Sequence, residues 1–249
     1  MSEAATLDWQ GHPIRCHDCR HQAVQKDGLC QKGQACVRDQ RARRVDRFFV
    51  QQPELADEYL SHPYFEVRAT AAKYASIFKI AALINDSEAD VRISAAFRLP
   101  LPRIQHLAHD PDARVRAAIA PKMGRAELIS MTKDPDYAVR CVVARILPHD
   151  LLYLLIGDPE PDVRRWAVLR LPIEKLLPLA MDPDPMVRIE VAERMAPSLL
   201  GVLVKDKDLR VRFTVAERIP IQDLGPLLDD ADPLVRDVAQ QRLTQSSPG

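Results

Sequence analysis

Apolar positions recur along the chain with a fixed period of 24 residues, from residue 62 almost to the C-terminus. The dipeptide Val-Arg marks this period at Val67-Arg68, Val91-Arg92, Val115-Arg116, Val139-Arg140, Val163-Arg164, Val187-Arg188, Val211-Arg212 and Val235-Arg236. A constant period of about 20 to 50 residues is the signature of a solenoid, in which each unit packs against its neighbours. We predict eight repeats that start at residues 62, 86, 110, 134, 158, 182, 206 and 230, the last of them truncated.

Each repeat carries the signals of one α-helix followed by a shorter helical segment. Position 1 is Asp in seven repeats and position 2 is often Pro, so we expect Asp to cap the helix and Pro to occupy its first turn. Apolar residues at positions 6, 10 and 14, with a small residue at position 11, predict one buried stripe. Pro at position 15 of several repeats ends the helix.

The second half of each repeat has the spacing of a 3₁₀ helix. Apolar residues fall at positions 16, 19 and 22, three residues apart. Pro178 and Pro226 lie inside such segments, where they disfavour a regular α-helix. No segment alternates apolar and polar residues as a half-buried strand does. The predicted fold class is therefore all-α, a solenoid of 24-residue repeats that alternate α-helix and 3₁₀ helix.

Composition and charge exclude several classes of protein. Lys plus Arg and Asp plus Glu both number 35, and this zero net charge argues against a strongly basic nucleic-acid binder. Aromatic residues make up 5% of the chain, too few for a base-stacking surface. No apolar run is long enough to span a membrane, and the first residues do not form a secretory signal. We therefore expect a cytoplasmic protein without a membrane partner.

Four of the five cysteines lie close together near the N-terminus. Cys16, Cys19, Cys30 and Cys36 follow the pattern C-x2-C-x10-C-x5-C. Clustered thiols in a reducing compartment indicate a shared metal centre rather than disulfides. Structural zinc most often uses two close pairs, and the second pair here is five residues apart. A [4Fe-4S] cluster tolerates irregular spacing, so the spacing leaves the cluster and zinc both open.

Three other residues near or outside this cluster have simpler interpretations. His17 and His21 lie beside the first cysteine pair, but four thiolates already complete a ligand set. We therefore expect both histidines to be solvated neighbours. Cys141 falls within a predicted repeat helix, and we interpret it as a small packing residue.

The repeat start D-P-x-x-x-V-R-x-x-[AV]-A, the 24-residue length and the four cysteines ahead of the array together resemble the leucine-rich repeat variant (LRV) family. The strand segment L-x-L of ordinary leucine-rich repeats is missing, and 24 residues cannot hold the two full helices of a HEAT-type repeat. The resemblance implies a right-handed superhelix and an N-terminal domain that binds a [4Fe-4S] cluster. It implies Cys16, Cys19, Cys30 and Cys36 as the cluster ligands. It does not indicate which activity, if any, the protein has.

Two columns of basic residues run along the repeats. Arg at position 7 recurs in every repeat, four residues after a mostly acidic position 3, so we expect an i,i+4 ion pair. We expect Asp at position 1 of a neighbouring repeat to contribute to this pairing as well. The second column, at position 13, is less well paired in the sequence and is the better candidate for a partner-binding surface; its members include Arg98, Arg170, Arg194 and Arg218.

The cysteine segment is basic and joins the array through a predicted helix at residues 37–50. Nine basic and four acidic residues occupy positions 15–47, and positive charge there stabilises an anionic cluster. Arg41, Arg44 and Arg47 are spaced to line one face of that helix, toward the cluster or a partner. We assign residues 1–50 to an iron-sulfur cluster domain with its linking helix, and residues 51–249 to the solenoid.

These observations favour an iron-sulfur protein whose solenoid binds another macromolecule in a redox-linked manner. No catalytic motif occurs, so we assign no catalytic residue and expect no catalytic activity of its own. The expected partner is an unidentified protein, because a solenoid presents a long surface and little enclosed volume. A zinc-stabilised interaction scaffold and a nucleic-acid-binding solenoid remain the alternatives.

Overall fold

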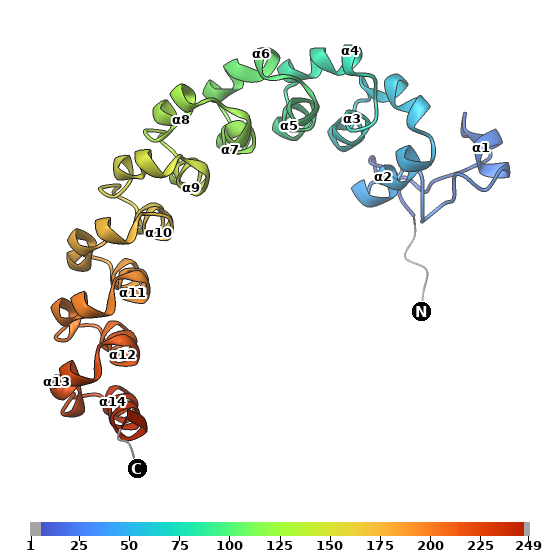
Figure 1. Ribbon diagram of the computed structural model, residues 1–249. Coiled ribbons are helices and arrows are strands. Elements are labelled where there is room, and N and C mark those ends of the chain that lie inside the picture. Colours follow the sequence, from blue (N-terminus) through green and yellow to red (C-terminus); the bar gives the residue numbers. More distant parts are fainter. Residues whose placement is uncertain (1–5, 247–249) are drawn as a thin grey trace. The chain divides into compact units, whose positions relative to one another are not determined.

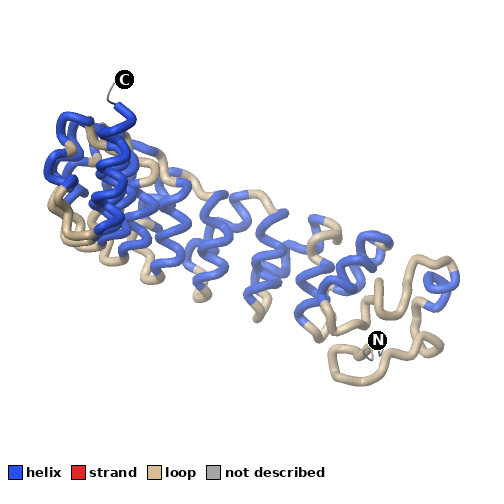
Figure 2. Tube along the Cα trace, turned by 90° about the horizontal axis from the view of Figure 1, so that it is seen from below, coloured by secondary structure: helices blue, strands red, loops and turns tan. Residues whose placement is uncertain are grey.

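A computed structural model describes residues 6–246 and divides the chain into two compact units, Met1–Met123 (unit 1) and Gly124–Gly249 (unit 2). Both units consist of helices and connecting loops (Figures 1 and 2). Within the described residues the only β pairing is three isolated bridges near the N-terminus, and no helix is long and apolar enough to cross a membrane.

Unit 1 begins with the cysteine segment and continues into the first three repeats. Figure 2 shows most of the chain before α2 as loop. The helices, with 3₁₀ helices labelled η, are α1 (Gln22–Lys26), α2 (Ala42–Gln51), η1 (Pro53–Tyr59), α3 (Phe65–Ala71), α4 (Ile77–Ile80), η2 (Ala81–Asn85), α5 (Ala89–Arg98), α6 (Leu101–Ile104), η3 (Gln105–His109), α7 (Ala113–Ile119) and η4 (Ala120–Lys122).

Unit 2 contains the remaining repeats. Its helices are α8 (Arg125–Met131), α9 (Tyr137–Ile146), η5 (His149–Leu154), α10 (Pro161–Val168), η6 (Ile173–Lys175), η7 (Leu177–Met181), α11 (Pro185–Arg194), η8 (Pro197–Leu203), α12 (Leu209–Arg218), η9 (Ile221–Asp223), α13 (Gly225–Leu228) and α14 (Pro233–Ser246). In Figure 1 the longer helices of each unit stack along one side and the short ones along the other.

The alternation of longer α-helices with shorter helical segments is confirmed, with one difference in the short segments. Repeats 4, 5 and 6 have only 3₁₀ helices there, as predicted, whereas α4, α6, α8 and α13 are short α-helices. The apolar spacing of three is compatible with both forms over a single turn, because a short α-helix also places residues three apart on one side.

The repeat core lies where the periodicity predicts it, except at position 16. In the first seven repeats the residues at positions 6, 10, 11 and 14 are buried, as are residues at positions 19 and 22 such as Ile80 and Leu83; in the last repeat Gln240 and Leu243, at positions 11 and 14, are exposed. The apolar residue at position 16 lies outside this core, since Ile77 is 43% and Ile173 is 48% exposed. The residue at position 16 is the first of the short helix. The buried residue at position 19 follows one turn later.

The predicted helix start is wrong by two residues. The longer helices begin at position 4, and their N-caps are the residues at position 3, which are acidic in every repeat but the first, where Tyr64 takes this place. Asp184, for example, accepts the backbone N–H of Met186 at 2.8 Å. The Asp at position 1 instead forms a turn before the helix, as where Asp182 accepts the N–H of Asp184 at 2.9 Å.

An ion pair between successive repeats explains why position 1 is almost always Asp. In unit 2, Arg164 donates from Nε and Nη2 to both carboxylate oxygens of Asp182, at 2.7 and 2.8 Å. Its Nη1 donates to the carbonyl of Asp158, at the start of its own repeat, at 2.8 Å. The same bidentate pairs are Arg68–Asp86 and Arg92–Asp110 in unit 1, and Arg140–Asp158, Arg188–Asp206 and Arg212–Asp230 in unit 2.

The expected i,i+4 pair between positions 3 and 7 is therefore wrong as the main partner of the arginine. Arg188 pairs with Asp206 at 2.6 Å, eighteen residues later, whereas Asp184 caps its own helix. A carboxylate that accepts two N–H bonds from one planar guanidinium is a stronger partner than an exposed i,i+4 neighbour.

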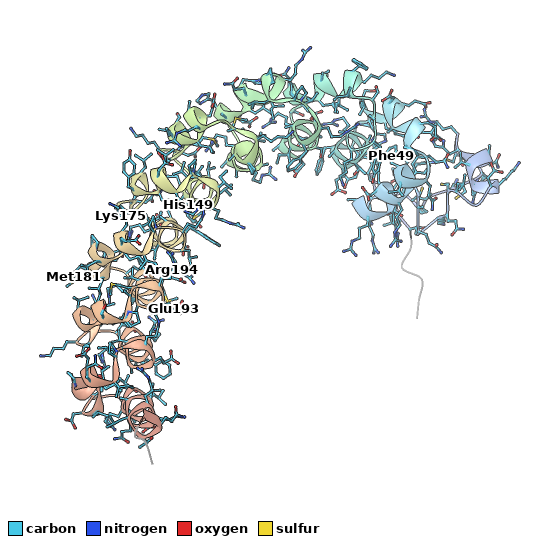
Figure 3. The ribbon with its side chains drawn as sticks, viewed as in Figure 1. Phe49, His149, Lys175, Met181, Glu193 and Arg194 are labelled. Atoms are coloured by element: carbon cyan, nitrogen blue, oxygen red, sulfur yellow. The ribbon has the colours of Figure 1, made fainter. Side chains whose placement is uncertain are left out.

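The basic residues at position 13 bind the preceding repeat. Arg170 donates from Nη1 to the carbonyls of Ala144 and Leu147 at 2.9 and 2.7 Å. These carbonyls lie at the C-terminal end of the previous long helix, where cations complement the helix dipole. Arg98, Arg194 (Figure 3), Arg218, Lys122 and Arg242 make equivalent bonds. The column thus has a structural role, and its part in partner binding stays a prediction.

A helix pair that the period did not reveal precedes the first repeat. Helix α2 and η1 follow the same order of long and short helix, and both pack against α3. Val45, Phe48 and Phe49 (Figure 3) form the buried face of α2. The predicted domain boundary between residues 50 and 51 falls within α2, next to this buried face.

We predict that the repeat-to-repeat ion pair contributes far more to stability than an exposed pair of the same type. Asp182→Ala should lower the free energy of unfolding by about 3–5 kcal/mol, because it leaves the buried Arg164 without its carboxylate. Asp182→Asn should cost less, since its amide oxygen still accepts the N–H of Asp184. Urea unfolding followed by circular dichroism measures both changes.

The matched control is Asp150→Ala, which removes the partner of Arg125 in an exposed pair. Its unfolding midpoint should stay close to that of the unchanged protein, because solvent screens exposed pairs. Equal losses for Asp182→Ala and Asp150→Ala would contradict a special role for the ladder.

Candidate metal centre

The four N-terminal cysteines line one small cavity in unit 1. Cys16, Cys19, Cys30 and Cys36 share its wall with Ile14, His21 and Gln25. Cys30 and Cys36 are buried, whereas Cys16 and Cys19 are partly exposed. The fifth cysteine, Cys141, belongs to α9 in unit 2 and is partly buried there. The structure therefore brings these four cysteines to one cavity and leaves Cys141 elsewhere, and their role as metal ligands stays a prediction.

The first cysteine pair is held by a tight turn that leads into α1. The N–H of Cys19 donates to the carbonyl of Cys16 at 3.2 Å, and the N–H of Gln22 donates to Cys19 at 3.1 Å. Helix α1 ends in a Schellman motif, in which Leu29 N–H bonds to the carbonyl of Val24 and Gly28 has φ +75°. This reversal directs the chain back so that Cys30 reaches the cavity.

A five-residue hairpin explains the unusual spacing of the second pair. Gln31 and Ala35 exchange two backbone hydrogen bonds, of 2.8 and 2.9 Å, so Cys30 and Cys36 leave the hairpin side by side. Gly33 lies at its tip with φ +80°, a conformation that side chains with a Cβ rarely adopt. The x5 spacing is thus a closed loop that brings two thiols together.

A buried carboxylate fixes the segment after Cys36. Asp39 is fully buried, accepts the N–H of Arg41 at 3.0 Å and pairs with Arg44 at 2.9 Å. The N–H of Cys36 donates to the carbonyl of Arg44 at 3.0 Å. Arg44 therefore supports the cysteine loop from α2, while Arg41 and Arg47 are exposed. The three arginines therefore do not form the single face that we expect from the sequence, because Arg44 is engaged in an ion pair while the other two are exposed.

The two buried thiols influence each other's ionisation. The hydrogen bond from Cys30 lowers the pKa of Cys36 to about 7, against the smaller opposing effect of burial. The same bond, together with burial, raises the pKa of Cys30. The Cys36 thiol can therefore lose its proton near neutral pH. The other cysteines must lose their protons when a metal binds.

The expectation that both histidines are solvated is wrong for His21. His17 is exposed and lies 3.2 Å from Asp18, as expected for a solvated neighbour. His21 is only 7% exposed, and its ring packs against Phe48 with centroids 5.2 Å apart. Burial lowers the pKa of His21, with a further contribution from Arg20. Its partner Tyr59 is 38 residues away in the sequence, so no local signal indicates this burial.

The donor set suits an iron-sulfur cluster. Four cysteines line the cavity together with Ile14, His21 and Gln25, and no carboxylate is among its lining residues. Soft sulfur ligands favour iron-sulfur clusters and zinc over hard cations. Within residues 6–246, no group of three His, Cys, Asp or Glu side chains is arranged to hold a metal ion directly. When bound, a cluster at these cysteines would supply one-electron transfer.

Comparison with known proteins agrees with both parts of the molecule. A family model described as the LRV protein FeS4 cluster matches residues 6–58 and so supports an iron-sulfur cluster. A solved structure described as a leucine-rich repeat variant with a novel repetitive structural motif is 35% identical, with a TM-score of 0.83. The match covers 92% of this chain and 99% of that one. The chain belongs to the leucine-rich repeat variant family.

Two further matches are less extensive or less similar. This LRV protein is 46% identical over 86 residues to the uncharacterized 27.7 kDa protein in the nifB 3′ region of Rhodobacter capsulatus. That match spans 34% of this chain and 35% of the relative. A solved engineered protein matches 92% of the LRV chain and 91% of its own, at 16% identity and a TM-score of 0.42. The chain is thus an iron-sulfur helical repeat protein of the LRV family.

Gly33→Ala should weaken metal binding by the LRV protein. A Cβ at Gly33 would have to adopt φ +80° and would lie 3.1 Å from the Thr6 side chain, and the left-handed backbone alone costs about 1–2 kcal/mol. Less metal per chain should be retained during buffer exchange, as measured by metal analysis. The control Gly157→Ala meets no atom within 4 Å and has an ordinary φ; metal loss equal to that of Gly33→Ala would refute this role of the hairpin.

Proposed function

We propose that this LRV protein holds one [4Fe-4S] cluster at Cys16, Cys19, Cys30 and Cys36, and that its solenoid binds a protein partner in a way that depends on the redox state of the cluster. It acts in the reducing cytoplasm and has no catalytic activity of its own. Free thiols at all four positions and the basic segment around them support this assignment.

The observation that carries the proposal is the convergence of four cysteines on one cavity, inside a region that matches an iron-sulfur family model. Cys16 and Cys19 form the partly exposed edge of this cavity. Electrons enter or leave most easily where a cluster is least covered by protein, so we place the exchange with other molecules at that edge.

The packing of unit 1 offers a route from the cluster to the repeats. His21 lies in the cavity wall and touches Phe48 of α2 and Tyr59 of η1. Both elements pack against α3, the long helix of the first repeat. A change in cluster charge therefore acts, through these contacts, on the residues that pack against the first repeat.

The exposed arginines of α2 are the proposed contact with the partner. Arg41, Arg43 and Arg47 are exposed, and the last two are four residues apart on one helix face. Like charges at this spacing repel each other mildly, and an acidic surface on a partner would relieve that repulsion. The nearby pair of Arg44 and Asp39 fixes this helix beside Cys36.

The ligand assignment predicts a sharp difference among the five cysteines. Replacing Cys16, Cys19, Cys30 or Cys36 by Ala should abolish the visible absorbance and the iron and sulfide content of anaerobically purified protein, because three thiolates do not complete the cluster's ligand set. Cys141→Ala is the matched control and should keep both. Stoichiometric zinc without iron or sulfide in the unchanged protein would overturn the proposal in favour of a zinc-stabilised scaffold.

Redox-linked binding predicts that partner affinity changes with the state of the cluster. Immobilised protein, oxidised or reduced under anaerobic conditions, should retain one protein from extract in different amounts, and a tenfold difference corresponds to about 1.4 kcal/mol of coupling. Cys16→Ala protein should show no such difference. Equal retention in both states would exclude the coupling, and salt-sensitive retention of nucleic acid instead of protein would favour a nucleic-acid binder.

A further inference from the structure

His21 connects the wall of the cysteine cavity with a polar network outside it. Its ring lines the cavity, whereas its Nε2 lies within hydrogen-bond distance of two groups that do not, the Nε of Arg20 at 3.2 Å and the hydroxyl of Tyr59. Arg20 is itself held by Glu58, at 2.6 Å. The ring position is fixed by contact with Phe48 and Tyr59, at centroid distances of 5.2 and 5.8 Å.

This network determines which nitrogen of His21 carries the proton. The Nε–H of a guanidinium can only donate, so Nε2 of His21 accepts. The hydroxyl of Tyr59 shares the same Nε–H of Arg20, at 3.2 Å, and its own proton is then directed to Nε2. A neutral imidazole has a single N–H, which places the proton of His21 on Nδ1.

The Nδ1–H group has no other use in the described structure. Within residues 6–246, the hydrogen bonds of the His21 ring all involve Nε2, and every fully buried side-chain nitrogen or oxygen in that range has a partner. Nδ1 therefore keeps some open space beside it. The ring is almost fully buried, and the cavity shared with the four cysteines is the open space described beside this residue.

We propose that the Nδ1–H of His21 donates a hydrogen bond to a sulfur of the bound cluster, and that Arg20 and Tyr59 are positioning residues that fix the required tautomer. The inference rests on the proposed function, because it needs the cluster to be present. A hydrogen bond to sulfur stabilises the reduced, more negative cluster, so it raises the reduction potential. His21 thereby sets the potential without being a ligand.

A redox titration of anaerobically prepared variants tests this role. His21→Phe keeps an aromatic ring but has no N–H, so its midpoint potential should fall. We expect about a tenfold lower ratio of reduced to oxidised cluster at a given ambient potential, or about 59 mV for one electron. His21→Asn keeps an N–H near the position of Nδ1 and should recover part of the shift. The exposed neighbour His17→Phe is the matched control and should leave the potential unchanged.

Resonance Raman spectra in deuterated buffer give a second measurement. The Fe–S stretching bands should shift on exchange of N–H for N–D, and His21→Phe should lose the part of that shift that comes from Nδ1. If His21→Phe fails to assemble a cluster, the double variant Arg20→Met/Tyr59→Phe tests the same point. It removes both donors to Nε2, so the proton is free to move there and part of the deuterium shift of the Fe–S bands should be lost.

Two results would overturn the inference. One is an unchanged potential in His21→Phe with full iron content, and the other is an unchanged deuterium shift in the same variant. Absence of iron and sulfide from the unchanged protein would instead overturn the proposed function itself, so the two failures are distinguishable.

Discussion

The solenoid depends on one bidentate ion pair that links each repeat to the next. The Arg at position 7 satisfies two carboxylate oxygens of the following repeat and a carbonyl of its own, as Arg164 does with Asp182 and Asp158. Both side chains are almost fully buried. A buried charge is tolerated only when it is paired and fully hydrogen-bonded, so the position of each repeat relative to its neighbour is closely restricted.

Each repeat forms polar contacts with the repeat that follows it and with the repeat that precedes it. Position 7 binds the repeat that follows, and position 13 binds the helix end of the repeat before it. Between these polar links lies the apolar stripe, in which residues such as Val163 and Ala167 are completely buried. Charge and hydrophobic packing therefore specify the same register, and this agreement between levels is typical of sequences with one stable fold.

Much of this architecture follows from the sequence because its period is regular. The Val-Arg spacing indicated the repeat length, the buried stripe and the helical class. The helix start was misplaced because Asp followed by Pro, as in Asp182-Pro183, is also a common helix-start signal. Here that Asp serves the arginine of the preceding repeat, and Asp184 caps the helix. Eighteen residues separate the paired groups, beyond the reach of any local rule.

The cysteine segment was predictable in its chemistry and less so in its geometry. Four clustered thiols indicated a metal centre, but the hairpin around Gly33 and the burial of His21 arise from contacts that spacing does not reveal. The partner of His21 is Tyr59, far along the chain, in a helix pair that lacks the Val-Arg signature. A motif that occurs once has no period to identify it.

Each ion pair joins only adjacent repeats, and this limits how such an array changes during evolution. Because the Arg at position 7 forms its ion pair with the Asp that begins the next repeat, duplicating or losing one whole repeat in the middle of unit 2 leaves an equivalent Asp at the same place. Unequal recombination between similar gene segments produces such changes in a single event. A change in the number of repeats therefore leaves every remaining Arg with an Asp partner, whereas an insertion of one residue within a repeat displaces the Asp from its Arg.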